Sequence, residues 1–241
     1  MTELNVVFIK AFDLNDAWYQ CIKAAIEKGH EYTITCGSYE GQKRKEFDFI
    51  TVQITNPGNR PLAPIVPEGM IPPTNDETIE KYFLEYLATD QKKPDEDYTY
   101  GQRLTNPAAS LTDRLDGLKM KNVNQPEEVI RMYKEGGHGT NQATMEIATP
   151  FDIQLKDPPC MRLIDTRVRY GKLHFMTYFR SWDLVGGFPA NLGALQLLKE
   201  HMAKEIGVED GEIMAQSKGL HIYEHYWDYA KIRTYKNDKT V

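Results

Sequence analysis

Apolar and β-branched residues are concentrated in two neighbouring runs, 161–169 and 172–180, and this composition predicts two β-strands. The only turn signal between the runs is Tyr170-Gly171, so the strands are expected to form a hairpin. Because tyrosine is poorly suited to the left-handed first position of a two-residue turn, we predict a three-residue loop, Arg169-Tyr170-Gly171, with Gly171 left-handed. In that register Cys160 lies opposite Arg180, whereas a two-residue loop would place it opposite Ser181.

Other segments show either helical or strand-like patterns. Apolar residues at helical spacing predict helices over 15–28, 76–87, 127–135 and 190–206. Further strands are predicted over 4–9, 31–36, 47–54, 143–148 and 212–217. Residues 37–45 form a polar link, and the segment 56–73 contains six prolines and is expected to be a connecting loop. Strands and helices mixed along 241 residues indicate one α/β (α+β) domain spanning residues 1–241.

Composition narrows the classes of protein. The net charge is −6 and there is no long Lys/Arg block, so we expect no nucleic-acid partner. No apolar run approaches the roughly 18 residues that cross a bilayer, and the N-terminus lacks signal-peptide features, so we expect no membrane association. Three cysteines, Cys21, Cys36 and Cys160, suit a reducing compartment, and Cys21 lies on the apolar face of a predicted helix. The sequence therefore predicts a soluble, cytoplasmic protein.

The predicted hairpin places reactive groups together. Directly opposed residues in an antiparallel pair have Cβ atoms roughly 4.5–5.5 Å apart, so the Arg180 guanidinium would reach the Cys160 thiol. A fixed positive charge there would lower the pKa of the cysteine and stabilise its thiolate. Ser181 and Asp183 follow directly and add a hydroxyl and a carboxylate. The alternative is that Cys160 is a small buried apolar residue and Arg180 forms a surface ion pair.

Four short motifs occur in a fixed order around this hairpin: Pro-Pro-Cys at 158–160, Arg-Ser-Trp-Asp at 180–183, Gly-Phe-Pro-Ala-Asn at 187–191 and His-Ile-Tyr at 221–223. From Asp157 to Tyr226 the chain resembles thymidylate synthase and its pyrimidine-hydroxymethylase relatives, and it is most similar to the short archaeal-type members. The resemblance implies one large, mixed, twisted sheet covered by helices, with the other sheet face used for homodimerisation.

The resemblance also implies a reaction. In that family a cysteine attacks C6 of the pyrimidine of dUMP, and the resulting enolate takes a one-carbon unit at C5 from 5,10-methylenetetrahydrofolate, the co-substrate, giving dTMP and dihydrofolate. One alternative is a 5-hydroxymethylase acting on dUMP, dCMP or CMP, in which water replaces the hydride. Another is a non-catalytic nucleotide-binding protein. A nucleotide, a folate and a second copy of the chain are thus the expected partners.

Site roles carry over by motif. Cys160 is the expected nucleophile, Arg180 and Ser181 the ligands of the 5′-phosphate, and Asp183 the residue that orders water and folate. Asn191 would read the N3–H and O4 edge of uracil, although an asparagine capping the following helix is the alternative. The sugar 3′-hydroxyl would contact His221 and Tyr223.

Tyr100, in the Asp-Tyr-Thr-Tyr-Gly segment, is the candidate for removing the C5 proton through water, although it could equally be a packed loop tyrosine. His221 and His225 have no third ligand at useful spacing, so no metal site is predicted.

The chain departs from the family pattern at several positions. Asn141-Gln142 stands where most members carry an arginine pair that reaches the partner's phosphate, so these residues are candidate substrate ligands without charge. Tyr82 stands at the position of a family glutamate, with Glu80 and Glu85 as possible replacements. Arg44 is a further phosphate candidate in the polar link. The chain ends at Val241 without the long C-terminal arm of larger members, which leaves closure of the site open.

Overall fold

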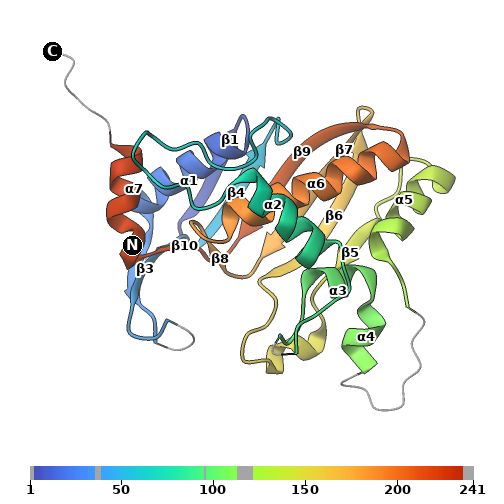
Figure 1. The fold of residues 1–241 in the computed structure, drawn as a ribbon, viewed down its shortest axis with the longest axis horizontal. Coiled ribbons are helices and arrows are strands. Elements are labelled where there is room, and N and C mark those ends of the chain that lie inside the picture. Colours follow the sequence, from blue (N-terminus) through green and yellow to red (C-terminus); the bar gives the residue numbers. More distant parts are fainter. Residues whose placement is uncertain (1–2, 36–38, 95, 113–121, 236–241) are drawn as a thin grey trace.

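A computed structural model describes residues 3–35, 39–94, 96–112 and 122–235, and its centre is a six-stranded mixed sheet (Figure 1). Counted from one edge of the sheet to the other, the first and second strands pair in parallel, as do the third and fourth. All other neighbouring strands pair antiparallel. The large mixed sheet expected from the sequence is thus confirmed. Its order is β1 (Val6–Ala11), β4 (Phe49–Ile54), β9 (Glu209–Ser217), β7 (Lys172–Phe179), β6 (Met161–Arg169) and β5 (Thr144–Glu146).

A second, four-stranded sheet was not predicted. It has the order β2 (His30–Thr33), β3 (Lys43–Glu46), β10 (Leu220–Tyr223) and β8 (Trp182–Asp183). Strand β3 has the sequence Lys-Arg-Lys-Glu and falls partly in the segment assigned to a polar link. Its strand conformation comes from backbone pairing with β2 and β10, and this pairing brings Arg44 opposite Tyr223.

The predicted helices are all present, with shifted ends. Helix α6 (Phe188–Ile206) begins two residues earlier than expected, with Gly187 as its N-cap residue. Helix α6 lies over the six-stranded sheet, and α2 (Asp76–Tyr82) packs against α6 (Figure 1). Short helices α3 (Tyr100–Thr105), α4 (Pro107–Thr112) and α7 (Trp227–Thr234) had no clear periodicity in the sequence. The other elements are α1 (Leu14–Lys28), α2 (Asp76–Tyr82) continuing into a π-helical turn η1 (Phe83–Leu87), α3 (Tyr100–Thr105), α4 (Pro107–Thr112), α5 (Gln125–Gly136), α7 (Trp227–Thr234) and the 3₁₀ turns η2 (Pro150–Gln154) and η3 (Glu224–Tyr226).

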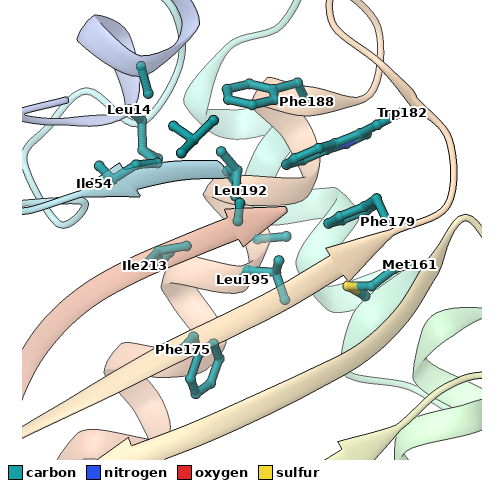
Figure 2. Packing of buried hydrophobic residues seen from close by; sticks show 14 of the residues in the cluster. Leu14, Ile54, Met161, Phe175, Phe179, Trp182, Phe188, Leu192, Leu195 and Ile213 are labelled. Atoms are coloured by element: carbon teal, nitrogen blue, oxygen red, sulfur yellow. The ribbon is translucent and has the colours of Figure 1, made fainter. Parts of the chain in front are cut away.

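The core lies between the large sheet and helix α6. Alternate residues of β7 are buried, because successive side chains of a strand point to opposite faces. At the end of the strand the rings of Phe179 and Trp182 stack with centroids 3.9 Å apart, and Phe188 packs on the other side of Trp182 (Figure 2). This aromatic packing fixes the indole of Trp182, which donates a hydrogen bond to the candidate site residue Asn191. Cys21 is fully buried in the core, as predicted, and Cys36 lies outside the described residues.

The hairpin differs from the predicted loop but keeps the predicted pairing. Arg169 pairs with Lys172, so the turn has two residues, and Tyr170 does adopt a left-handed conformation (φ 54°). The three-residue loop was therefore wrong. A β-bulge between Met161 and Leu163 then shifts the register by one residue. As a result Arg180 N donates to Cys160 O at 2.8 Å, and the opposition of these two residues is confirmed.

The opposite face of the large sheet is less buried. Side chains such as Met176 of β7 and Met214 of β9 are half-buried in the single chain. On the edge strand β1, Val6 and Phe8 are 69% and 63% exposed. This apolar surface is compatible with the expected dimer face, and that use of it stays a prediction.

Candidate active site

Six of the predicted site residues line one hollow of about 260 Å³, here called the nucleotide hollow. It lies where the end of the β6–β7 hairpin meets the second sheet. The Arg-Ser-Trp-Asp motif crosses from β7 into β8, and β10 pairs with β8, so segments some forty residues apart come together. Ile34, Tyr39, Arg44, Asp157 and Trp182 complete the lining. The predicted residues are Cys160, Arg180, Ser181, Asp183, His221 and Tyr223.

Burial, rather than the arginine, dominates the chemistry of Cys160. Burial raises the pKa of the thiol, while the charges of Arg180 and Arg162 lower it and the Asp157 carboxylate raises it further. The predicted net lowering was therefore wrong in direction. The Arg180 guanidinium donates to the carbonyls of Pro158 (3.1 Å) and Pro159 (3.3 Å) and to Asp157 Oδ1 (3.0 Å). The ligand-free site thus holds a neutral thiol beside a guanidinium that is tied to the Pro-Pro-Cys backbone.

Asp183 shapes the turn that leads into helix α6. Its Oδ1 accepts from Val185 N at 2.9 Å, and its carboxylate also accepts from the backbone of Gly186. Burial raises the pKa of this carboxyl group, and the two backbone donors partly oppose the shift. Asp183 therefore has a structural task in addition to the site role implied by the family resemblance.

His221 lines the hollow and carries a hydrogen-bond acceptor that has no partner among the described residues. Its Nδ1 lies 2.8 Å from Gly219 O, and because a carbonyl can only accept, Nδ1 carries the proton. The remaining nitrogen, Nε2, is buried and has no hydrogen-bond partner among the described residues. Burial lowers the pKa of His221 to about 4, so the ring is neutral at physiological pH. The Tyr223 ring lies 4.8 Å away, and burial raises its pKa to about 12. A neutral acceptor beside a neutral phenol suits a ligand hydroxyl.

Asn191 is oriented by two side chains. Its Oδ1 accepts from Trp182 Nε1 at 2.9 Å, and its Nδ2 donates to Tyr82 Oη at 2.9 Å. Because an indole N–H can only donate, this pair of contacts fixes which end of the amide is oxygen. The residue lies inside the first turn of α6 and does not cap the helix, so the capping alternative is wrong. One amide hydrogen and one oxygen lone pair remain for a ligand.

Tyr82, which the motif alignment places at the position of the family glutamate, contacts Asn191, whereas Glu80 and Glu85 are exposed. It belongs to a cluster of four tyrosines that pack ring against ring. Ring centroids are 5.1 Å apart for Tyr82–Tyr86, 5.4 Å for Tyr86–Tyr100 and 5.9 Å for Tyr98–Tyr100. Sequence reasoning found two members only, because their convergence depends on the path of the loop between α2 and α3.

Tyr100 lies in helix α3 rather than in a loop. Its hydroxyl accepts from Met161 N at 3.2 Å, beside the nucleophile candidate. Burial raises its pKa well above the ordinary value for tyrosine, and the nearby groups Tyr82 and Cys160 add to this shift. Tyr100 is therefore a neutral phenol that can donate a hydrogen bond and cannot itself act as a base.

Asn141 and Gln142 do not line the nucleotide hollow. Both are exposed, and Asn141 Oδ1 accepts from Arg167 Nη2 at 2.9 Å on the large sheet. Arg44 does line the hollow, where its Nη2 pairs with Glu46 Oε2 at 2.9 Å. Val241 lies outside the described residues. In the described part of the chain, no group of three or more His, Cys, Asp or Glu side chains is placed to hold a metal, and no helix is long and apolar enough to span a membrane.

Comparisons with known proteins identify the family and the fold of the chain. The profile of the family described as "Thymidylate synthase" matches residues 76–240. A Methanosarcina acetivorans protein named "Putative thymidylate synthase" is 33% identical over 220 residues, which is 91% of either chain. A protein of that name from Methanothermobacter marburgensis is 31% identical, over 92% of this chain and 96% of its own. The thermostable thymidylate synthase A from Bacillus subtilis has the same fold, with a TM-score of 0.68 and 17% identity over 92% of this chain and 84% of that one. The chain belongs to the thymidylate synthase family.

Proposed function

We propose that this enzyme transfers a one-carbon unit to C5 of dUMP and forms dTMP, with Cys160 adding to C6 of the pyrimidine. The observation that carries the proposal is the convergence of Cys160, Arg180, Ser181, Asp183, His221 and Tyr223 on one hollow. A thiol next to guanidinium groups suits covalent addition to an electron-poor ring.

The orientation of the nucleotide follows from the hydrogen-bonding character of each group. Asn191 keeps one donor and one acceptor free, which matches the O4 and N3–H edge of uracil. The neutral Nε2 of His221 accepts from the sugar hydroxyl, and Tyr223 lies beside it. Arg180 and Ser181 hold the phosphate, for which a guanidinium is the preferred partner.

Because the thiol of Cys160 is neutral in the ligand-free site, it must lose its proton before it attacks. The positive charges of Arg180 and Arg162 favour this loss. The adjacent phenol of Tyr100 is neutral, so it orders water or donates to developing charge on the pyrimidine.

The residues beyond Tyr82 fit a folate co-substrate. A hollow of about 600 Å³ is lined by the rings of Tyr82 and Tyr86, by the side chains of Lys81, Lys92 and Lys93, and also by Glu85 and Glu96. Flat aromatic surface suits a pterin or aminobenzoyl ring, and the lysines suit glutamate carboxylates. Methylenetetrahydrofolate would supply the one-carbon unit and, for a synthase, the hydride. Asp183 is the candidate contact from the nucleotide side.

The test is to incubate the purified protein with dUMP and methylenetetrahydrofolate. Formation of dTMP with stoichiometric dihydrofolate, followed by absorbance and mass spectrometry, is the expected result. Binding of dUMP without product would contradict the proposal and favour a non-catalytic nucleotide-binding protein.

A 5-hydroxymethylase is the second candidate, and the presence of Tyr82 at the glutamate position favours it. A phenol there changes how water is ordered next to Asn191. The same incubation separates the two functions, since a hydroxymethylase acting on dUMP yields a product heavier than dTMP by one oxygen and forms no dihydrofolate. Running dCMP and CMP in parallel identifies the preferred base.

Removing the nucleophile gives the sharpest check. Cys160→Ala should lower turnover by at least about 10⁴-fold, because the covalent route is lost as a whole. Affinity for dUMP, measured by calorimetry, should stay within a few-fold of the wild-type value. Cys21→Ala is the matched control, and turnover by Cys160→Ala near the wild-type rate would exclude this cysteine as the nucleophile.

The chain is expected to act as a homodimer joined through the less buried face of the large sheet, which carries Met176, Met214, Val6 and Phe8. Analytical ultracentrifugation should give twice the mass of the chain. Replacement of Met176 by Asp should shift the population towards monomer if this face is the interface.

A further inference from the structure

A further hollow, here called the basic hollow, lies on the other side of Arg180 and has a volume of about 430 Å³. Three cations line it, Arg162, Arg180 and Lys218, together with the hydroxyl-bearing side chains of Tyr178 and Thr149. Within the described residues no Asp or Glu lines it. Arg180 borders both this hollow and the nucleotide hollow, so an anion in the basic hollow would adjoin a nucleotide beside Cys160.

Two of the cations converge on a single carbonyl. Arg162 Nη1 donates to Pro159 O at 3.1 Å, and Arg180 Nε donates to the same oxygen at 3.3 Å. Bringing two like charges this close costs free energy that one neutral carbonyl offsets only in part. An anion between the guanidinium groups would turn the repulsion into attraction.

The ion pairs around the hollow leave charge available. Arg180 pairs with Asp157, but that carboxylate is 76% exposed and lines the nucleotide hollow instead. In the described part of the chain, the side chain of Arg162 donates only to a carbonyl. The lining of the basic hollow offers no acidic side chain to Arg162 or Lys218. Both guanidinium groups also lower the pKa of Cys160, which places Arg162 within electrostatic reach of the sulfur.

We propose that Arg162 and Lys218, together with Arg180, bind the 5′-phosphate of the substrate nucleotide, an inference that rests on the proposed function. The chain would thus supply from its own sheet the positive charge that Asn141 and Gln142 lack. Guanidinium groups that converge on one point form short, charge-assisted hydrogen bonds with phosphate oxygens.

The test compares ligands with and without a phosphate. Calorimetry should show that Arg162→Gln and Lys218→Gln each weaken dUMP binding by roughly fivefold to tenfold, the cost of one partly exposed charge-assisted bond. Binding of deoxyuridine should stay within twofold, and binding of inorganic phosphate should be lost in the double variant. Lys218→Arg should restore most of the affinity. Arg169→Gln, an exposed arginine on the same strand, is the matched control.

Each outcome bears on the proposal. Equal losses for dUMP and deoxyuridine would overturn it, because the substitutions would then act on the fold or the base site. An Asn141→Ala/Gln142→Ala variant that loses as much dUMP affinity as the Arg162/Lys218 double variant would also overturn it. Phosphate binding that depends on Arg162 and Lys218 in a protein without turnover would uphold the anion site and remove only the proposed function. If the double variant turned over dUMP normally with an unchanged KM, the proposed function would stand and the phosphate role of Arg162 and Lys218 would be excluded.

Discussion

Two arginine–aspartate ion pairs have similar nitrogen–oxygen distances but differ in their exposure to solvent. Arg103 Nη2 is 2.8 Å from Asp152 Oδ1, and the side chains are 2% and 0% exposed. Arg180 Nη2 is 3.0 Å from Asp157 Oδ1, and these side chains are 28% and 76% exposed. The first pair joins helix α3 to the η2 turn, and the second borders two hollows.

The difference lies in what each arginine can give up. A buried guanidinium cannot leave its carboxylate without stranding a charge in the interior, so Arg103 is confined to a structural role. An exposed pair contributes little to stability, so Arg180 can exchange Asp157 for an incoming anion at small cost. An ion pair of ordinary geometry therefore marks a binding residue when its carboxylate partner is exposed and the guanidinium borders open space.

The largest effect should come from breaking the buried pair. Arg103→Met removes one partner of a fully buried ion pair and should lower the free energy of unfolding by roughly 3–5 kcal/mol. Urea denaturation followed by circular dichroism measures this change. The double variant Arg103→Met/Asp152→Leu should recover part of the loss. A loss below about 1 kcal/mol in the single variant would show that the pair is not the structural tie described here.

The same substitution at the exposed pair should act on catalysis. Arg180→Met should change the free energy of unfolding by only about 1–2 kcal/mol, because the Asp157 carboxylate is exposed and the main loss is the hydrogen bonding to the Pro158 and Pro159 carbonyls. Its kcat/KM for dUMP should fall by roughly 10²–10³-fold, the scale of losing a charge-assisted contact with the substrate. Steady-state kinetics and denaturation on one preparation test both halves. Large destabilisation with little kinetic loss would reverse the roles of the two arginines.

A smaller effect is expected at Tyr82. Tyr82→Phe removes the hydroxyl that accepts from Asn191 and frees the amide to rotate. The value of kcat/KM for dUMP should fall about tenfold, on the scale of one buried hydrogen bond, and the preference for dUMP over dCMP should narrow. Tyr98→Phe removes a hydroxyl from another ring of the tyrosine cluster and is the matched control. An unchanged base preference would rule out Tyr82 as a positioning residue for Asn191.

The smallest effect concerns the ionisation of Cys160. Asp157 raises the pKa of this thiol, so Asp157→Asn should lower it and increase the thiolate fraction at any pH below the pKa. Alkylation by iodoacetamide should therefore be a few-fold faster at pH 7, and its pH profile should move towards lower pH. The exposed Asp97→Asn is the control. A profile displaced towards higher pH would contradict the assigned sign.

The sequence was informative where local pattern decides the structure. The hairpin and helix α6 follow from runs of apolar residues, and the large mixed sheet was implied by the family resemblance. The motifs at 158–160, 180–183 and 221–223 do converge on one hollow. Asn191 could be placed near the hairpin, yet its partners Trp182 and Tyr82 depend on tertiary packing.

Other features depend on interactions between distant parts of the chain, which no short stretch of sequence contains. The pKa of Cys160 reflects competition between burial and two guanidinium charges, and only the packed structure decides which prevails. Strand β3 consists of charged residues and is a strand only because β2 and β10 flank it. The left-handed Tyr170 is tolerated because a two-residue turn with positive φ at both positions matches the twist of the flanking strands.

The bulge between Met161 and Leu163 controls more than register. Side chains alternate between the two faces of a strand. One extra residue therefore moves each preceding side chain to the opposite face of the sheet. Met161 is buried together with its partner Phe179, and Cys160 and Arg180 consequently take the opposite parity and line the nucleotide hollow. In a ladder without the bulge the sulfur would take the inward parity and be sealed among hydrocarbon groups. A single inserted residue thus separates a reactive thiol from an inert one.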